Sequence, residues 1–319
     1  MNQKESLEYL DPEVSVLCIA YNHRPYIEEC LESIVSQETS FNFEIIIHDD
    51  CSTDGTTEFL KDYEHKHSNL RVIYEKENQY SKGIKITPIL IKESRGKYLA
   101  FCECDDFYCD KYKLQKQYEA IKSHPNCIAC IHDAKKMDET RKIVGTRSPK
   151  YDNPIQGQKE ILYCVGHLYA YNSLFVKKIS IDDLMDDSLY KDCTVGDIPI
   201  ALHLSLKGSF FYIKEELSVY RMGTIGSWSK RMKGDRNKAL KYANSVVEML
   251  KKYDSMTNYI LHEVVLDRIE VFEYQRVQQE GNLMEALSPR FRKRFFNSPL
   301  TLKVRLMAYF FLKHVRKEM

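Results

Sequence analysis

Four short apolar runs are spaced along the first third of the chain, separated by amphipathic or polar stretches. Because each run is brief and rich in β-branched or aromatic residues, it predicts a buried strand rather than a helix. The runs are Val14–Ala20, 43–47, Leu70–Tyr74 and 97–102.

The stretches between these runs have helical patterns. A second helix is expected after the cap-forming residues 52–57, and a third over 87–94. The strand–helix alternation predicts an α/β fold with a mostly parallel, twisted sheet flanked by helices on both faces. In the first helical stretch, apolar residues recur at i, i+3, i+4, i+7 and i+8: Ile27, Cys30, Leu31, Ile34 and Val35.

Polar side chains follow three of the expected strands, and the carboxyl ends of parallel strands form the edge where ligands bind. Clustered carboxylates repel one another, and the hard cations Mg²⁺ and Mn²⁺ relieve that repulsion and bind phosphates. If the backbone stays extended, Glu103 and Asp105 point the same way. Alternatively, Asp105 and Asp106 cap a helix that begins near Asp110. The polar residues are Tyr21 and Asn22, then Asp49 and Asp50, then Glu103, Asp105 and Asp106.

Composition indicates a globular protein with one main domain and an appendage: 319 residues, 43% hydrophobic and 29% charged, with a net charge of +1. That charge balance gives no reason to expect nucleic acid as a partner. The first residues lack the apolar core of a signal peptide, and no apolar run approaches the ~20 residues that span a bilayer. We therefore expect a cytoplasmic protein.

Three common kinds of site are not expected, because the sequence lacks the motifs that are typical of them. The ten cysteines lie largely in apolar runs, the pair Cys127 and Cys130 among them. The cluster of Cys102, Cys104 and Cys109 has no second pair at zinc-site spacing. The first strand is not followed by G-x-G-x-x-G, and no G-x-x-x-x-G-K-[ST] occurs. Structural zinc, a dinucleotide site and a P-loop are therefore not expected.

The second half contains fewer signals. Asp197 precedes an apolar helical stretch, and from the residues alone it resembles a helix N-cap. His167 either faces a bound ligand or lies in the core. Residues 210–213 and 217–220 predict two short strands. The loop 220–229 then holds Arg221, two glycines and the only tryptophan, Trp228, so it either closes over a ligand or is an ordinary surface loop.

The C-terminal part becomes helical from Arg236 onward, which predicts a helical region over 235–319 beside a main domain over 1–234. The segment 288–319 has nine basic residues and one acidic residue, a charge of +8, interspersed with aromatic residues. Such a segment is either a peripheral anchor on an anionic membrane or a terminal helix packed on the body.

Three motifs together resemble the family 2 glycosyltransferases with the GT-A fold. They are the strand 16–22 with its Tyr-Asn end, the D-D-x-S-x-D-x-T turn over 49–56, and the acidic triplet over 103–106. They occur in that family's order and spacing, and the resemblance covers about residues 12–230. It implies a nucleotide-binding half over 12–110 and an acceptor half over 111–234.

The resemblance also implies roles for individual residues. Asp105 holds Mn²⁺ or Mg²⁺ on the diphosphate, and Asp197 acts as the catalytic base. Asp106 and His167 are expected near the sugar or the acceptor. The residues expected to bind the nucleotide-sugar are Ala20, Tyr21, Asn22, Asp50, Asp54, Asn78, Glu103, Cys104, Asp105, Arg221 and Trp228.

The activity that follows is an inverting, metal-dependent transfer from a nucleotide-diphosphate sugar, with a UDP-sugar expected. The acceptor is the hydroxyl of a glycan or a lipid-linked acceptor, as in bacterial surface-polysaccharide synthesis. The protein is then cytoplasmic, with 288–319 on the inner face of the membrane. The alternatives are a metal-dependent nucleotidyltransferase or phosphohydrolase, and an inactive nucleotide-sugar-binding protein.

Overall fold

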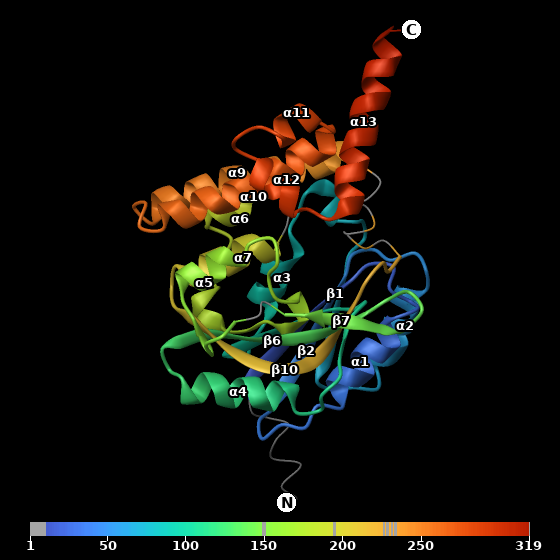
Figure 1. Cartoon of the computed structure of the whole chain (residues 1–319). Coiled ribbons are helices and arrows are strands. Elements are labelled where there is room, and N and C mark those ends of the chain that lie inside the picture. The colour runs from blue at the N-terminus through green and yellow to red at the C-terminus, as the bar shows by residue number, and fades with distance from the viewer. Residues whose placement is uncertain are drawn as a thin grey trace, which may run out of the picture. The chain divides into compact units, whose positions relative to one another are not determined.

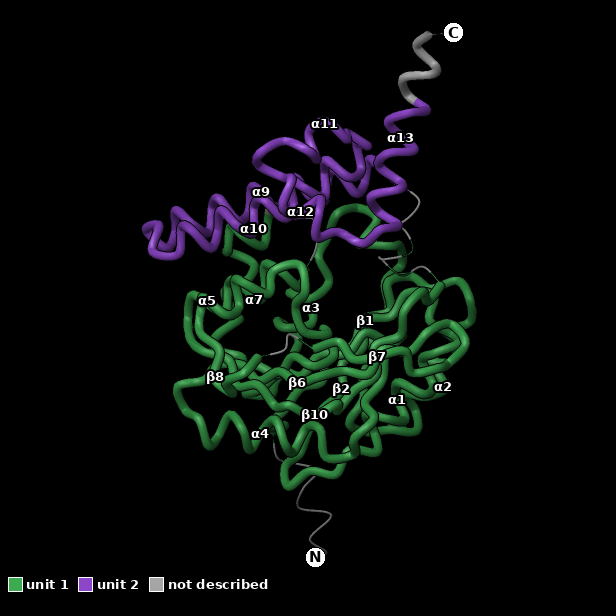
Figure 2. Tube along the Cα trace, in the orientation of Figure 1, with its two compact units in different colours: residues 1–191, 196–230 green, residues 192–195, 231–319 purple. Residues whose placement is uncertain are grey.

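The computed structural model describes residues 11–148, 151–193, 196–225, 227, 230, 232 and 235–318, with the side chains of 192 and 313–318 left aside. The chain divides into two compact units (Figure 2). Unit 1 comprises Met1–Lys191 and Gly196–Lys230, and unit 2 comprises Asp192–Val195 and Arg231–Met319. The sheet and all of the described candidate site residues belong to unit 1.

Four parallel strands form the first half of the sheet, in the order β3-β2-β1-β4. Their alternate residues face α1, α2 and α4 and share one apolar core with them. Figure 1 shows α3, α5 and α7 on the opposite side of the sheet from α4. The strands are β1 (Val14–Ala20), β2 (Phe43–Asp49), β3 (Leu70–Tyr74) and β4 (Tyr98–Glu103).

The helices of this half confirm the sequence prediction closely. The expected third helix, 87–94, is α3, and the helix expected from about Asp110 begins at Lys113. The helices of unit 1 are α1 (Ile27–Val35), α2 (Thr56–Glu64), α3 (Ile86–Glu93), α4 (Lys113–Ser123), α5 (Gln158–Tyr163), α6 (Ser188–Asp192, whose last residue falls in unit 2) and α7 (Asp197–Ser205).

The second half of the sheet is mixed, because antiparallel strands interrupt the expected mostly parallel sheet there. β9 runs antiparallel to both β4 and β6, whereas β10 runs parallel to β6. β5, β7 and β8 pair at the margins, all antiparallel. The strands are β5 (Phe107–Tyr108), β6 (Cys127–Met137), β7 (Ile143–Arg147), β8 (Ile155–Gln156), β9 (Phe175–Lys177) and β10 (Ser209–Arg221).

The prediction of two short strands over 210–213 and 217–220 was wrong, because both belong to β10. The register against β6 shifts between Ile213 and Glu216 and again between Glu216 and Ser218. The charged residues between the two apolar segments are exposed at this irregularity. A bulge therefore interrupts the alternating pattern without ending the strand.

Unit 2 is helical in the part that the structure describes. Tyr274 and Val277 of α10 form a small apolar core with Phe291, Phe295 and Leu306. No described helix in either unit combines the length and the apolarity needed to cross a bilayer. The helices are α9 (Arg236–Met256), α10 (His262–Glu280), α11 (Leu283–Ala286), α12 (Arg292–Asn297) and α13 (Leu300–Glu318).

Candidate functional site

An acidic turn follows β4 at the carboxyl edge of the parallel strands. An extended backbone was expected here, but the chain turns, because the Asp106 N–H donates to the Glu103 carbonyl over 2.9 Å. The turn nevertheless gathers the three acids: one carboxylate oxygen each of Glu103, Asp105 and Asp106 lies within 4.8 Å of the others. Hard oxygen ligands in this arrangement fit a divalent cation such as Mg²⁺ or Mn²⁺.

Asp106 is the buried member of the turn, with 1% of its surface exposed. Its carboxylate accepts hydrogen bonds from the Arg221 N–H (2.8 Å) and from Nδ2 of Asn172 (3.1 Å). Burial, followed by the charges of Asp105 and Glu103, raises its pKa well above the ordinary value. Asp106 thus joins the end of β10 to the turn, and its expected contact with the sugar or acceptor stays a prediction.

The alternative in which Asp105 and Asp106 cap a helix is excluded by these contacts. Asp110 makes the cap-like contact instead, because its Oδ1 accepts from the Tyr112 N–H over 2.7 Å just before α4. Asp105 remains partly exposed, and its Oδ2 accepts from the hydroxyl of Thr224 over 2.7 Å. The chain beyond β10 therefore also reaches the turn.

Arg221 is buried, and its side chain holds the acidic turn in place. Its Nη1 donates to the Asp105 carbonyl over 2.6 Å, and its Nη2 pairs with Glu29 of α1. The guanidinium also lies 4.6 Å from the centre of the Phe107 ring. These contacts tie three elements together, and the expected contact of Arg221 with a diphosphate stays a prediction.

Asn22 connects the ends of β1 and β2. Its backbone is left-handed, with φ of 56°, a conformation that asparagine tolerates better than most residues. Its N–H donates to Oγ of Ser52 (2.9 Å), and its Oδ1 accepts from the Thr53 N–H (2.8 Å). Asp54 holds the same loops, accepting from the Arg24 N–H (3.0 Å) and the Thr56 N–H (3.1 Å).

Asp50 is buried, and both of its carboxylate oxygens accept backbone N–H groups, from Gln79 (2.7 Å) and Tyr80 (3.1 Å). Asn78 completes this contact, because its Nδ2 donates to the Asp50 carbonyl and its Oδ1 accepts from the Ser81 N–H. Both residues therefore fasten the loop after β3 to the end of β2. Their expected contact with the nucleotide stays a prediction.

Ala20 and Cys104 are present at the edge only through their backbones. Both side chains are fully buried. The Ala20 carbonyl accepts from the Asp50 N–H (3.0 Å), and the Cys104 N–H donates to the Ile19 carbonyl (2.9 Å). Tyr21, in contrast, is exposed, and its expected contact with the nucleotide stays a prediction.

Asp197 is the first residue of α7, one position beyond the cap, which is Gly196. Its Oδ1 accepts from the Ile198 N–H over 2.9 Å. Burial raises the pKa of Asp197, and the positive charge of Arg147 opposes that shift. Asp197 is therefore not the N-cap of α7. It is a half-buried carboxylate on which the positive charge of Arg147 acts.

Arg147 contributes a positive charge to the surroundings of both Asp197 and Tyr220. The Arg147 guanidinium lies 5.3 Å from the centre of the Tyr220 ring, and its Nε donates to the Leu168 carbonyl over 3.0 Å. Burial raises the pKa of Tyr220 to about 12, with Arg147 opposing and the three acids of the turn adding to the shift. Sequence reasoning missed Arg147, because nothing in the local pattern of β7 marks it.

His167 and Trp228 complete the set of expected residues. His167 is exposed, so the alternative of a core histidine was wrong, and its contact with the sugar stays a prediction. Trp228 lies outside the described residues, and the expected closing of its loop stays a prediction as well.

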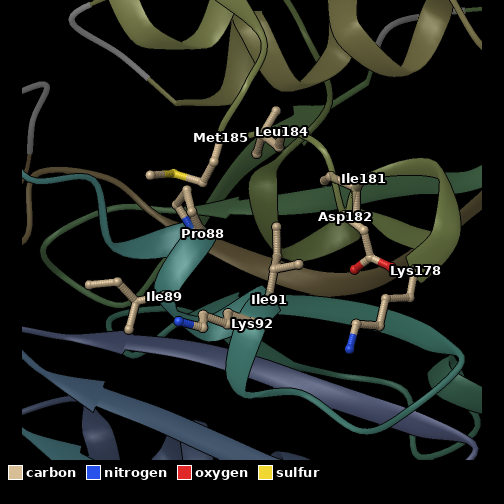
Figure 3. Close-up of a pocket in the computed structure, with 9 residues that line it drawn as sticks. All are labelled: Pro88, Ile89, Ile91, Lys92, Lys178, Ile181, Asp182, Leu184 and Met185. Carbon is tan, nitrogen blue, oxygen red and sulfur yellow. The ribbon is translucent and has the colours of Figure 1, made fainter.

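A separate cavity of about 400 Å³ lies between α3 and the segment around Ile181 (Figure 3). Pro88, Leu184 and Met185 contribute to its apolar lining. No residue of the expected site lines it, so we assign the candidate site to the acidic edge of the sheet.

Comparison with known proteins gives a consistent picture. The family model described as Glycosyl transferase family 2 matches residues 15–180. An uncharacterised protein of Mycobacterium tuberculosis is 29% identical over 219 residues, which are 67% of this chain and 60% of that protein. The chain thus spans about 60% of the length of the curated relative.

Two solved structures share the fold. TarS 1–349 of Staphylococcus aureus in complex with UDP-GlcNAc has a TM-score of 0.56 at 17% identity, covering 88% of this chain and 82% of that one. The mannosyltransferase PcManGT from Pyrobaculum calidifontis, in complex with GDP-Man and Mn²⁺, has a TM-score of 0.56 at 15% identity, covering 95% and 87%. At these identities the likeness shows the fold alone, which is the expected GT-A fold.

Proposed function

The chain belongs to glycosyl transferase family 2, and we propose that it transfers a sugar from a nucleotide-diphosphate sugar to an acceptor hydroxyl with inversion at the anomeric carbon. The observation that carries the proposal is the acidic turn of Glu103, Asp105 and Asp106 at the carboxyl edge of β1 and β4. The half-buried Asp197, whose ionised form the charge of Arg147 favours, supports the proposal as a candidate base.

The donor is a UDP-sugar in this proposal. Two proteins with the same fold bind nucleotide-sugars, UDP-GlcNAc in TarS and GDP-Man in PcManGT. The nucleotide lies along the ends of β1 and β2, where Tyr21 is exposed. Asn22, Asp50, Asp54 and Asn78 support that surface by holding its loops together.

Asp105 is the ligand for Mn²⁺ or Mg²⁺ in this proposal, and the carboxylates of Glu103 and Asp106 are gathered beside it. A divalent cation bound there supplies positive charge to the diphosphate as it leaves. The hydroxyl of Thr224 and the guanidinium of Arg221 keep Asp105 in place, through its carboxylate and its carbonyl respectively. Support for the metal comes from the three gathered oxygens and from the Mn²⁺ bound to PcManGT.

Asp197 takes the proton from the acceptor hydroxyl as it attacks the anomeric carbon. A general base of this kind contributes ~10²–10⁴-fold to the rate. The base must be ionised to act, and the neighbouring charge of Arg147 favours the ionised form. We propose a glycan or a lipid-linked molecule as the acceptor and the cytoplasm as the location. Membrane attachment is not required for this chemistry.

The test is a screen of nucleotide-sugars with and without Mn²⁺, measuring release of nucleoside diphosphate. Asp105→Asn removes one charged ligand and is expected to lower metal-dependent turnover by ~10²–10³-fold. The matched control is Asp62→Asn on the exposed surface of α2, which should retain full activity.

Three results would contradict the proposal. Release of pyrophosphate or orthophosphate would indicate a nucleotidyltransferase or phosphohydrolase. Binding without turnover under all conditions would indicate an inactive nucleotide-sugar-binding protein. Unchanged, metal-dependent turnover in Asp105→Asn would remove the acidic turn from the mechanism.

A further inference from the structure

The helix α13 has two apolar faces, and only one of them is covered within unit 2. Leu306 is 1% exposed and packs with Phe291 and Phe295, and Phe310 packs against the same cluster. This face accounts for part of the apolar content of the tail. These residues are therefore packed within unit 2, and the expected alternative, packing of the tail on the main domain, stays a prediction.

The other face consists of Leu300, Val304, Met307 and Phe311, which are 73%, 52%, 37% and 64% exposed. Their spacing of four, three and four residues places them along one side of the helix. Phe296 at the end of α12 is 64% exposed as well. Scattered apolar residues on a surface need no explanation, but a continuous helical stripe of this kind marks an interaction site.

The charge around this stripe is strongly positive. Of the nine basic residues in 288–319, Arg290 and Arg294 form ion pairs with acidic residues of α10. The other seven basic residues of the segment outnumber its single acidic residue, Glu318. Lys303 and Arg305 are the immediate neighbours of Val304, so they flank the stripe on either side.

We propose that the exposed face of α13 docks on an anionic lipid surface, with the helix lying in the plane of the interface. Charge selects this occupant. A second copy of the chain would bring an equally positive stripe against the first, whereas anionic headgroups complement it. Attachment is peripheral, because no described helix is able to span a bilayer. The inference uses residues of unit 2 only and does not rest on the proposed transfer reaction.

The experiment uses the full chain and co-sedimentation with vesicles of phosphatidylcholine, with and without phosphatidylserine, at low and high salt. We expect binding that requires phosphatidylserine and weakens with salt. The triple variant Val304→Ser, Met307→Ser, Phe311→Ser should bind about tenfold more weakly or worse, with unchanged thermal unfolding because these side chains are exposed. Lys303→Gln and Arg305→Gln should each weaken binding about fivefold.

The matched control is Met256→Ser, Ile260→Ser, Met284→Ser, which removes three exposed apolar side chains elsewhere in unit 2 and should leave binding unchanged. Three results would overturn the proposal: equal partitioning of the stripe variant and the unaltered chain, binding that ignores phosphatidylserine, and self-association that the stripe variant abolishes without any vesicle binding. The last would identify a second copy as the occupant.

Discussion

Asp197 is the residue on which the proposed transfer depends most directly. Its carboxylate accepts only one described hydrogen bond, from the adjacent Ile198 N–H, so removal of its charge should leave the start of α7 intact. We expect Asp197→Asn to bind the nucleotide-sugar within a few-fold of the unaltered protein and to lower transfer by ~10²-fold or more. Earlier unfolding with full specific activity would instead make Asp197 a purely structural residue.

Arg147 should affect the pH dependence of the transfer reaction, because its charge acts on the proposed base Asp197. Burial raises the pKa of Asp197 and Arg147 opposes the shift, so the base form of Asp197 is lost as the pH falls through that pKa. In Arg147→Gln the opposing charge is gone and the pKa rises further. The acid limb of the plot of transfer rate against pH should therefore move to higher pH.

Two controls make this reading specific. Arg147→Lys keeps the positive charge and should restore most of the acid limb, and Lys142→Gln on the same hairpin should not move it. A rate that falls equally at every pH in Arg147→Gln would mean that Arg147 supports the loop around Leu168 and does not act on Asp197.

At the scale of elements, the end of β10 and the turn after β4 depend on one buried carboxylate. Asp106→Ala leaves the Arg221 N–H without its acceptor and removes one of the two bonds that Nδ2 of Asn172 donates, whereas its bond to the Val219 carbonyl stays. Each buried donor without a partner costs about 1–3 kcal/mol, so the free energy of unfolding should fall by about 2–4 kcal/mol. Urea unfolding monitored by circular dichroism measures it.

Asp106→Asn is the informative companion, because it keeps one acceptor oxygen for Arg221 and should lose less stability than Asp106→Ala. Asp62→Ala on α2 controls for the loss of an exposed carboxylate and should change the unfolding free energy by no more than ~0.5 kcal/mol. An equal loss in both Asp106 variants would show that these hydrogen bonds do not hold β10 to the turn.

At the scale of the whole molecule, stability should be separable between the two units. Leu306 is buried in the small core of unit 2, and Leu306→Ala should lower the free energy of unfolding of that unit by about 2–4 kcal/mol. Nucleotide-sugar affinity should stay unchanged, because the expected binding residues belong to unit 1. Calorimetry of unfolding and of donor binding on one preparation measures both quantities.

The neighbouring Met307→Ala is the control for this prediction. Met307 belongs to the exposed stripe of α13 and is 37% exposed, so its truncation should change stability by ~0.5 kcal/mol or less. Loss of donor binding in Leu306→Ala would contradict the separation, since it would mean that unit 2 is needed to keep the site of unit 1 in order.

The sequence by itself determined the elements of the first half of the sheet. The bounds of β1, α1 and β3 agree with their apolar patterns, because each element buries one face against a shared core and the pattern records that burial. The acidic turn was also visible, since three carboxylates directly after a buried strand are a local feature. The mixed strand directions in the second half of the sheet were not visible in the sequence, because the antiparallel strand β9 is only three residues long.

Only the tertiary structure decided which polar groups find hydrogen-bond partners within the protein, and which partners these are. Asp106 meets Arg221 across more than a hundred residues of chain, and Asp50 meets the loop after β3. It also decided that Leu306 is buried while Met307 is not. A local pattern shows that a residue favours burial or carries a charge, but its partner is chosen by the packing of distant elements. These long-range choices therefore have no local signature in the sequence.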